Sequence, residues 1–275
     1  MRQHSKHVHS AHHHFSISYP VSLSQKLYTI VLGPLAVVAL VYFVTVLSPF
    51  IAPASGTEVT WNTIIAATGA TIIRLSIAYA LAVICALPLA LLVTYNRTVE
   101  ELLLPVFDIL QSVPILALFP VVVILFVNVG FLNGAAIFIL FASMLWSLVF
   151  TLVGGLKIIP HDIIDAAHIF GVRGFSFVRR VIFPALVPQF VTGSILAVAQ
   201  GWNIIIVAEV LRTYIPNGTS AQDLFGIGSI LVDASANAQG TVFVESVFAI
   251  IIVIAFINFF VWQKLLHYAQ RFRFE

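Results

Sequence analysis

Four polar side chains interrupt apolar stretches that are long enough to cross a membrane, and they are the first candidates for chemistry. They are Arg74, Gln200, Asn203 and Glu209. A polar or charged group inside a span is costly, so we expect it to face a bundle interior or a water-filled pathway. Two interpretations stay open. Either these groups line the route of a passing solute, or they bond to neighbouring helices, and Arg74 can also extend outward to the membrane surface.

A break in the backbone is the second candidate. Pro114 and Pro120 stand six residues apart at the start of an apolar run that ends near Asn128. Proline removes a backbone donor, and free backbone groups at membrane depth are tolerated only where they face protein or water. We therefore expect a bent or broken helix here and a pathway lining around Pro114, with simple helix geometry as the alternative.

Residues 165–184 are the third candidate, because they form the longest polar interruption in the second half of the sequence. The spacing predicts a short helix between Pro160 and Gly171, since proline suits a first helical turn and glycine the residue after the last. One side of this helix is expected to carry Ile159, Ile163, Ala166, Ala167 and Phe170.

A second short helix is expected after a turn at Gly174. Its predicted apolar face follows helical spacing, with Arg179 and Arg180 off that face. We expect Pro184 to end this helix and to begin the next span. Two short helices between spans form a projection that a protein outside the membrane can contact. The apolar face consists of Phe175, Val178, Val181 and Ile182.

Enzyme chemistry finds little support in the sequence. Six histidines lie in residues 1–26, where we expect a solvated tail, with metal binding as the alternative. The one cysteine, Cys85, lies in an apolar run, so no intramolecular disulfide can form. The phosphate loop Gly-x-x-x-x-Gly-Lys-Ser/Thr does not occur, and residues 154–157 lack its spacing. We predict no catalytic, cofactor-binding or metal-binding residue in this chain.

The composition predicts the elements that hold these residues. Hydrophobic residues make up 60% of the 275 residues and charged residues 9%, whereas about a quarter of a soluble domain is charged. The length allows about six spans of roughly 20 residues, and a net charge of +2 gives no field for nucleic acid. We predict an all-α, polytopic membrane bundle with spans near residues 27–50, 65–95, 111–128, 135–153, 185–211 and 243–266.

Two of these spans carry a stripe of small residues that allows another helix to approach closely. In the span 65–95, alanine repeats every four residues from Ala78 to Ala90. In the span 185–211, the stripe consists of Gly193, Ala197 and Gly201. We therefore expect another helix to pack closely against each of these two faces.

The basic residues predict the orientation. If the amino terminus is placed in the cytoplasm, only Arg212 falls in an outer loop, while Arg74 lies within a span. Because cytoplasmic loops are enriched in lysine and arginine, both termini and residues 157–184 are predicted to be cytoplasmic. The basic residues on that side are Arg2, Lys6, Lys26, Arg97, Lys157, Arg173, Arg179, Arg180, Lys264, Arg271 and Arg273.

The cytoplasmic segment resembles the coupling motif of permease subunits of ATP-binding-cassette (ABC) importers. That motif reads Glu-Ala-Ala, three residues, Gly, nine residues, then Ile-x-Leu-Pro. Residues 165–167 match its head, Gly171 follows at the right distance, and residues 181–184 fill its tail. Aspartate replaces glutamate, valine replaces isoleucine and phenylalanine replaces leucine, so each departure keeps the charge sign or the apolar character.

The resemblance runs from about residue 65 to the carboxyl terminus, and the most similar subfamily is the nitrate/sulfonate/taurine type. It implies a type I importer permease (MetI-like) fold in residues 64–268, preceded by the tail 1–26 and by a first span with its outer connection, 27–63. Residues 269–275 would be a cytoplasmic tail. The positions that it implies for contact with an ATPase are Asp165, Ala166, Ala167, Gly171 and Pro184.

The resemblance also implies partners and a function. The partners would be a cytoplasmic ABC ATPase dimer that binds ATP, a second permease subunit (a homodimer being expected), an extracytoplasmic solute-binding protein and the lipid of the inner membrane. The implied function is import of a small anion, such as nitrate, a sulfonate, taurine or bicarbonate. The alternative is an ion-coupled secondary transporter, which would usually show paired repeats. A membrane enzyme would need a catalytic cluster and a channel a selectivity filter.

Overall fold

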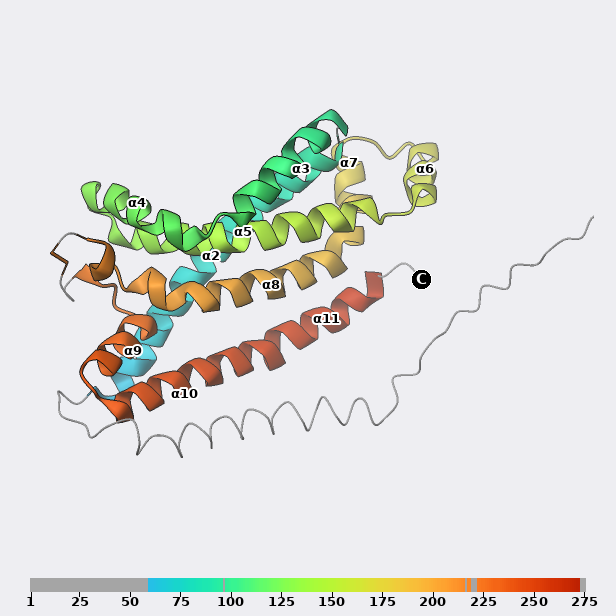
Figure 1. The fold of residues 1–275 in the computed structure, drawn as a ribbon. Coiled ribbons are helices and arrows are strands. Elements are labelled where there is room, and N and C mark those ends of the chain that lie inside the picture. The colour runs from blue at the N-terminus through green and yellow to red at the C-terminus, as the bar shows by residue number, and fades with distance from the viewer. Residues whose placement is uncertain (1–58, 96, 216, 219–221, 273–275) are drawn as a thin grey trace, which may run out of the picture. The chain divides into compact units, whose positions relative to one another are not determined.

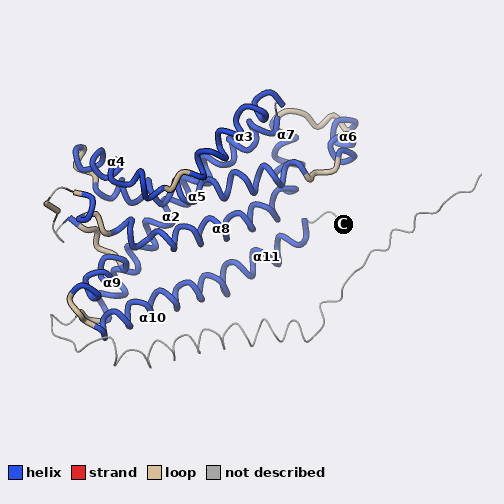
Figure 2. Tube along the Cα trace, in the orientation of Figure 1, coloured by secondary structure: helices blue, strands red, loops and turns tan. Residues whose placement is uncertain are grey.

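The computed structural model describes residues 59–95, 97–215, 217–218 and 222–272. All of its regular elements within those ranges are helical, as Figure 2 shows. The predicted histidine-rich tail 1–26 and first span 27–50 lie outside the described residues, as do residues 273–275. By contacts the chain divides into two units, 1–43 and 44–275, and every described residue belongs to the second.

Helix α2, Trp61–Tyr95, runs without a break through Pro88. Its alanine stripe is confirmed as a packing face, because Ala78, Ala82 and Ala86 are fully buried. Helix α5 packs along this face. Close approach of two backbones across small side chains is what the four-residue spacing predicted.

The predicted break at Pro114 is confirmed. Helix α3, Arg97–Ser112, and helix α4, Ile115–Asn128, meet at an angle of 84°. Pro114 lies at the break, because it cannot donate a backbone hydrogen bond, whereas Pro120 lies inside α4. A tight turn with Gly130 in the left-handed region, at a φ of 72°, leads from α4 into α5.

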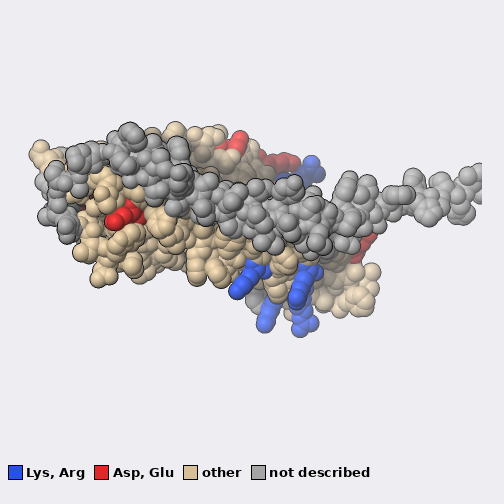
Figure 3. All heavy atoms as spheres, turned by 90° about the horizontal axis from the view of Figure 1, so that it is seen from below, with Lys and Arg blue, Asp and Glu red and all other residues tan. Residues whose placement is uncertain are grey.

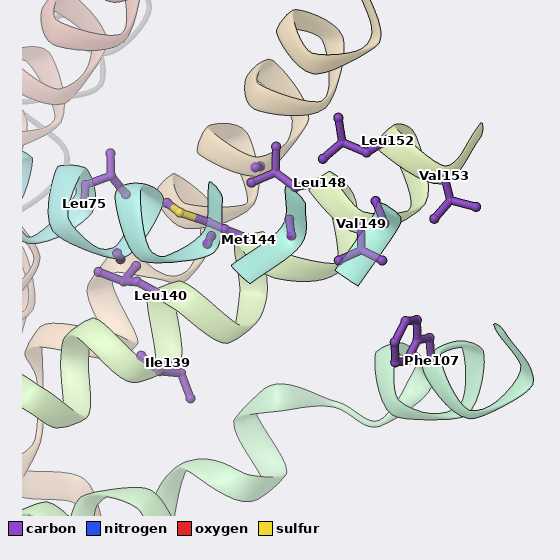
Figure 4. Packing of buried hydrophobic residues seen from close by; sticks show 14 of the residues in the cluster. Leu75, Phe107, Ile139, Leu140, Met144, Leu148, Val149, Leu152 and Val153 are labelled. Carbon is purple, nitrogen blue, oxygen red and sulfur yellow. The ribbon is translucent and has the colours of Figure 1, made fainter. Parts of the chain in front are cut away.

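Helices α5, Leu132–Lys157, and α8, Phe183–Glu209, form the centre of the bundle together with α2. Gly201 of α8 lies against Leu75 and Met144, so that a Cβ atom there would collide with both side chains. Figure 4 shows Met144 extending from α5 toward α2. The small stripe of α8 is therefore confirmed as a packing face, and a rigid three-helix core results.

Two short elements connect α5 to α8. Helix α6, His161–Ile169, ends as predicted at Gly171, whose φ of 72° is left-handed. Gly174, with a φ of 57°, makes the predicted second turn. The predicted apolar side of α6 is wrong at two positions: Ile159 and Ala167 are buried, but Ala166 is exposed and Phe170 is 83% exposed. Phe170 follows the last helical residue, so the helical period no longer places it on the buried side.

The predicted helix end at Pro184 is also wrong. Helix α7, Phe175–Phe177, continues through a π-helical turn, Val178–Ile182, directly into α8. Pro184 occupies the first turn of α8, where a missing N–H is tolerated. The widened π turn before it leaves room for the proline ring. The predicted off-face positions Arg179 and Arg180 are exposed, as expected.

The remaining elements follow α8. The 3₁₀ turn η3, Arg212–Tyr214, and helix α9, Ile227–Ala236, precede α10, Gly240–Ile257. A π-helical segment, Asn258–Trp262, leads into α11, Gln263–Ala269, and a final 3₁₀ turn, Gln270–Phe272. In Figure 1, α9 lies at one end of the bundle and α6 at the other. We call them the α9 end and the α6 end.

Four helices in the described residues are long and apolar enough to cross a membrane, and the α3–α4 pair makes five if it is one span. The four single helices correspond to predicted spans. Helix α4 lies within the predicted span 111–128, whereas most of α3 precedes it. The order of the spans along the chain is the predicted one, and the predicted all-α membrane bundle is therefore confirmed for this part of the chain.

Candidate functional site

Glu209 is the most deeply placed charged residue described at the α9 end. It is the last residue of α8, and its side chain is completely buried. One carboxylate oxygen accepts a hydrogen bond from the Thr71 hydroxyl at 2.6 Å. The same oxygen forms an ion pair with the Arg74 guanidinium at 2.5 Å. One turn of α2 therefore supplies both groups: Arg74 neutralises the carboxylate, and Thr71 adds a hydrogen bond.

All three nitrogens of the Arg74 guanidinium donate to neighbouring groups. Besides the contact with Glu209, its Nε donates to Asn133 at 2.9 Å and its second amino group donates to the carbonyl of Phe225 at 2.5 Å. Arg74 is 8% exposed, so it does not extend to the surface of the described unit. Of the two interpretations of this residue, pairing between helices is the one that these contacts support.

Helix α9 begins on the same carboxylate. The N–H of Gly228 donates to the second oxygen of Glu209 at 2.8 Å, and the N–H of Ile227 donates to the hydroxyl of Thr71 at 3.0 Å. A Cβ atom at Gly226 would collide with the carboxylate of Glu209. We call Thr71, Arg74, Glu209 and the loop 226–228 the Glu209 cluster.

A second ion-paired group folds the chain after α8 back on itself. Arg212 pairs with Asp233 of α9 at 2.7 Å and with Asp223 at 3.2 Å. The hydrogen bond from Arg212 to the Asp233 carboxylate raises the pKa of the guanidinium above its ordinary value. These contacts attach η3 to α9, which is the next α-helix along the chain.

A recess of about 510 Å³ lies beside the α3–α4 bend. Gln111 and Pro114 line it at the bend, the hydroxyl-bearing residues 143, 147 and 151 line it from α5, and Gln200 lines it from α8. None of the described residues that line it is charged. Aromatic and aliphatic side chains, among them Trp146, complete the wall, so a ligand would meet neutral donors on an apolar surface.

The predicted pathway residues thus fall into two groups. Pro114 and Gln200 meet in the recess, although they are far apart in sequence. Arg74 and Glu209 meet in the cluster at the α9 end. Asn203 is exposed on α8 one turn beyond Gln200 and is not among the residues that line the recess.

The residues that match the coupling motif lie at the α6 end. Asp165 and Ala166 are exposed, while Ala167 is buried against the rest of the unit. Backbone hydrogen bonds cap the end of α6: the N–H of Gly171 donates to the carbonyl of His168, and the N–H of Val172 donates to the carbonyl of Ala167. Ile169 and Phe170, each 83% exposed, project beside this turn.

These features define a class of protein, a helical membrane bundle with a broken span and a projecting short helix between two spans. The same fold occurs in a chain of the MetNI methionine ABC transporter, solved in inward-facing conformations. The TM-score is 0.61 at 18% sequence identity, and the match covers 78% of this chain and 99% of that chain.

Sequence comparison gives the family. The chain belongs to the family described as binding-protein-dependent transport system inner membrane component, whose model matches residues 78–273. The predicted family is thereby confirmed.

Named relatives are similar over part of their length. The nitrate import permease protein NrtB of Leptolyngbya laminosa is 28% identical over 156 residues, which cover 57% of this chain and 55% of the relative. The bicarbonate transport system permease protein CmpB of Synechococcus elongatus is 27% identical over 174 residues, 63% of this chain and 56% of the relative. The chain spans a little over half the length of these relatives.

Several residues of these sites were not predicted. Thr71 donates a hydrogen bond to Glu209, and Asn133 accepts one from Arg74. Nothing in the sequence around Thr71 or Asn133 indicates these contacts. The hydroxyl stripe of α5 could have been found, since Ser143, Ser147 and Thr151 repeat every four residues. The contact of the Gly226-Ile227-Gly228 turn with Glu209 depends on the tertiary fold.

Proposed function

We propose that this chain is the permease subunit of an ABC importer and that it forms the pathway by which a small anion enters the cell. A separate cytoplasmic ATPase powers the movement, and an extracytoplasmic solute-binding protein delivers the solute. Two permease subunits, which we propose to be identical, face each other across the pathway. The observation that carries this proposal is the exposed α6 segment in a chain of this family.

The α6 segment has the properties of a docking element. Ala166 is small and exposed, so a partner groove can approach the helix closely. Asp165 offers a charge-assisted contact to a basic group of the ATPase. Ile169 and Phe170 add exposed apolar surface beside the left-handed turn at Gly171. The helix that begins at Phe175 runs through Pro184 into α8, so a movement of the segment after the Gly174 turn is passed along α8.

The recess beside the α3–α4 bend is our candidate for this subunit's part of the pathway. Pro114 and Gln200 line it, and Asn203 extends the same exposed side of α8. The second permease subunit would close its open side. The Ser143 and Thr151 hydroxyls donate to carbonyls of their own helix. The neutral amide groups of Gln111 and Gln200 would hold an anion weakly, which suits a transporter that must release what it binds.

The orientation follows from the basic residues. Arg173, Arg179, Arg180, Lys264 and Arg271 are exposed toward the α6 end, and the basic side chains in Figure 3 gather in that direction. We propose that the α6 end and both termini are cytoplasmic and that the α9 end is extracytoplasmic. The ATPase and the binding protein then approach from opposite sides.

Reconstitution tests the proposal. The chain would be combined with its ATPase and binding protein in vesicles, and uptake of labelled nitrate and bicarbonate would be measured. We expect uptake that requires ATP and is lost in Asp165→Lys, whereas Arg97→Gln, which changes a surface ion pair, retains it. Uptake that persists without ATP and follows an ion gradient would instead establish a secondary transporter.

A further inference from the structure

The first turn of α9 is attached to the bundle by side chains from distant parts of the sequence. The first amide groups of a helix have no partner within the helix. Here the N–H of Ile227 donates to the hydroxyl of Thr71 in α2, and the N–H of Gly228 donates to the carboxylate of Glu209 in α8. The N–H of Gly226 bonds to the hydroxyl of Ser229, which completes the turn.

Glycine is required at both positions of this turn because there is no room for a side chain. Gly226 has a φ of −172°, an extended conformation that any residue adopts, so backbone strain does not explain it. A Cβ atom at Gly226 would instead collide with the Glu209 carboxylate. At Gly228 it would lie 2.9 Å from a Glu209 oxygen and 2.9 Å from the Cα atom of Ile206. The turn can approach Glu209 this closely only without side chains.

Each polar side chain of the cluster is bonded within the protein, and Arg74 is only 8% exposed. The Thr71 hydroxyl donates to Glu209 and accepts from Ile227. The guanidinium of Arg74 donates from all three of its nitrogens. A buried network whose members are all bonded rigidifies the elements that it joins. The elements joined here are α2, α5, α8 and α9.

Helix α9, which the cluster holds at its first turn, leads into a small, uncharged surface. Residues 235–238 form the turn between α9 and α10; all four are exposed and none is charged. Asp233, one turn earlier, is held by Arg212. A surface that is already ordered before a partner arrives loses less entropy on binding and binds more tightly.

We propose that Thr71, Arg74 and Glu209 are positioning residues: they fasten the first turn of α9 and so preset the α9–α10 turn as a contact surface for the solute-binding protein. This inference rests on the proposed function, which places the α9 end outside the cell. It gives Arg74 and Glu209 a role in partner recognition through α9, without contact with the solute.

Two matched pairs of variants test the proposal. Thr71→Val removes the hydroxyl that links Glu209 to α9, whereas Thr68→Val, one turn earlier on α2, removes a hydroxyl that donates only to its own helix at Ile64. Gly226→Ala places a Cβ atom against Glu209, whereas Gly69→Ala places one in open space.

The readout is ATPase activity of the complete complex in vesicles, measured against the concentration of the purified binding protein. We expect Thr71→Val and Gly226→Ala to raise the half-maximal concentration roughly tenfold, which corresponds to about 1.4 kcal/mol. The basal ATPase rate without binding protein stays at the wild-type value. Thr68→Val and Gly69→Ala match wild type in both readouts. A spin-label distance between Asn62 and Asn237 should broaden in Thr71→Val and in Gly226→Ala, and in neither control variant.

The outcomes are distinct. Unchanged binding-protein dependence in both test variants would overturn the inference. A loss of solute uptake, with ATPase activity that still depends normally on the binding protein, would also overturn the inference, because it would place the cluster in the pathway. A wild-type complex that the binding protein does not stimulate would overturn the proposed function itself, and the partner named here with it. In that case the spin-label distance still shows whether the cluster fastens α9.

Discussion

Glu209 and Asp165 are two carboxylates in one chain, and their surroundings differ in every respect. Glu209 is completely buried and is bonded by Thr71, Arg74 and Gly228. Asp165 is exposed on a nine-residue helix, and no ion pair to it occurs among the described residues. One carboxylate is satisfied by its own chain, and the other is available to a partner.

The same contrast extends to the basic residues around them. At the α9 end, Arg74 and Arg212 are held in ion pairs. Toward the α6 end, Arg179, Arg180 and Lys264 are exposed without an ion pair to any described carboxylate. Charges that are paired internally stabilise the fold of the subunit itself. Unpaired charges contribute little to that fold and are free to interact with a neighbouring protein or with lipid headgroups.

The comparison predicts that replacing each carboxylate with alanine has very different effects on stability. Glu209→Ala leaves the buried Arg74 without its partner and should destabilise the protein by about 3 kcal/mol. Asp165→Ala should change stability by less than about 0.5 kcal/mol, as surface substitutions do. Chemical unfolding in detergent, followed by circular dichroism, measures both. Equal effects of the two substitutions would contradict the distinction.

A smaller effect is expected for the turn that ends α6. Gly171→Ala forces alanine into the left-handed region and should cost about 1 kcal/mol. Gly154→Ala is the control, because Gly154 lies in the helix α5 with open space around it and without a positive φ. The same unfolding measurement applies, and we also expect Gly171→Ala to lower solute-stimulated ATPase activity. If both alanine variants were equally stable, the turn would not need glycine.

The smallest effect should come from an exposed ion pair. Arg97 and Glu101 of α3 form a pair at 3.0 Å with 90% and 68% of their side chains exposed. Arg97→Gln should change the free energy of unfolding by no more than about 0.5 kcal/mol. Measured beside Glu209→Ala, it separates ion pairing in water from ion pairing in the bundle interior. A loss as large as that of Glu209→Ala would show that burial is not the cause of the difference.

Much of the fold was predictable from the sequence because the membrane limits what a chain can form. A long apolar run has to satisfy its backbone hydrogen bonds internally, as a helix does, so four of the spans in the described region could be predicted, whereas most of α3 lay outside the predicted spans. Ala78, Ala82 and Ala86 revealed a packing face because their spacing repeats with the helix. Gly171 and Gly174 marked turns because few other residues adopt a positive φ.

The remainder could not be predicted because it depends on contacts between distant residues. Nothing local to Arg74 shows that its partner is Glu209, 135 residues away. The continuation of the helix through Pro184 depends on a π-helical turn that the sequence does not announce. Phe170 follows the apolar spacing of α6, yet it is exposed, because the helix ends one residue earlier.

The central claim is that the α6 end is where a separate ATPase binds this subunit, and site-specific cross-linking tests it most directly. In a Cys85→Ser background, Phe170→Cys places a thiol at the α6 end and Phe225→Cys places one at the α9 end, both at exposed positions. We predict that Phe170→Cys forms a cross-link to the ATPase in membranes and that Phe225→Cys does not. A cross-link from Phe225→Cys, or none from Phe170→Cys in an assembled complex, would contradict the account.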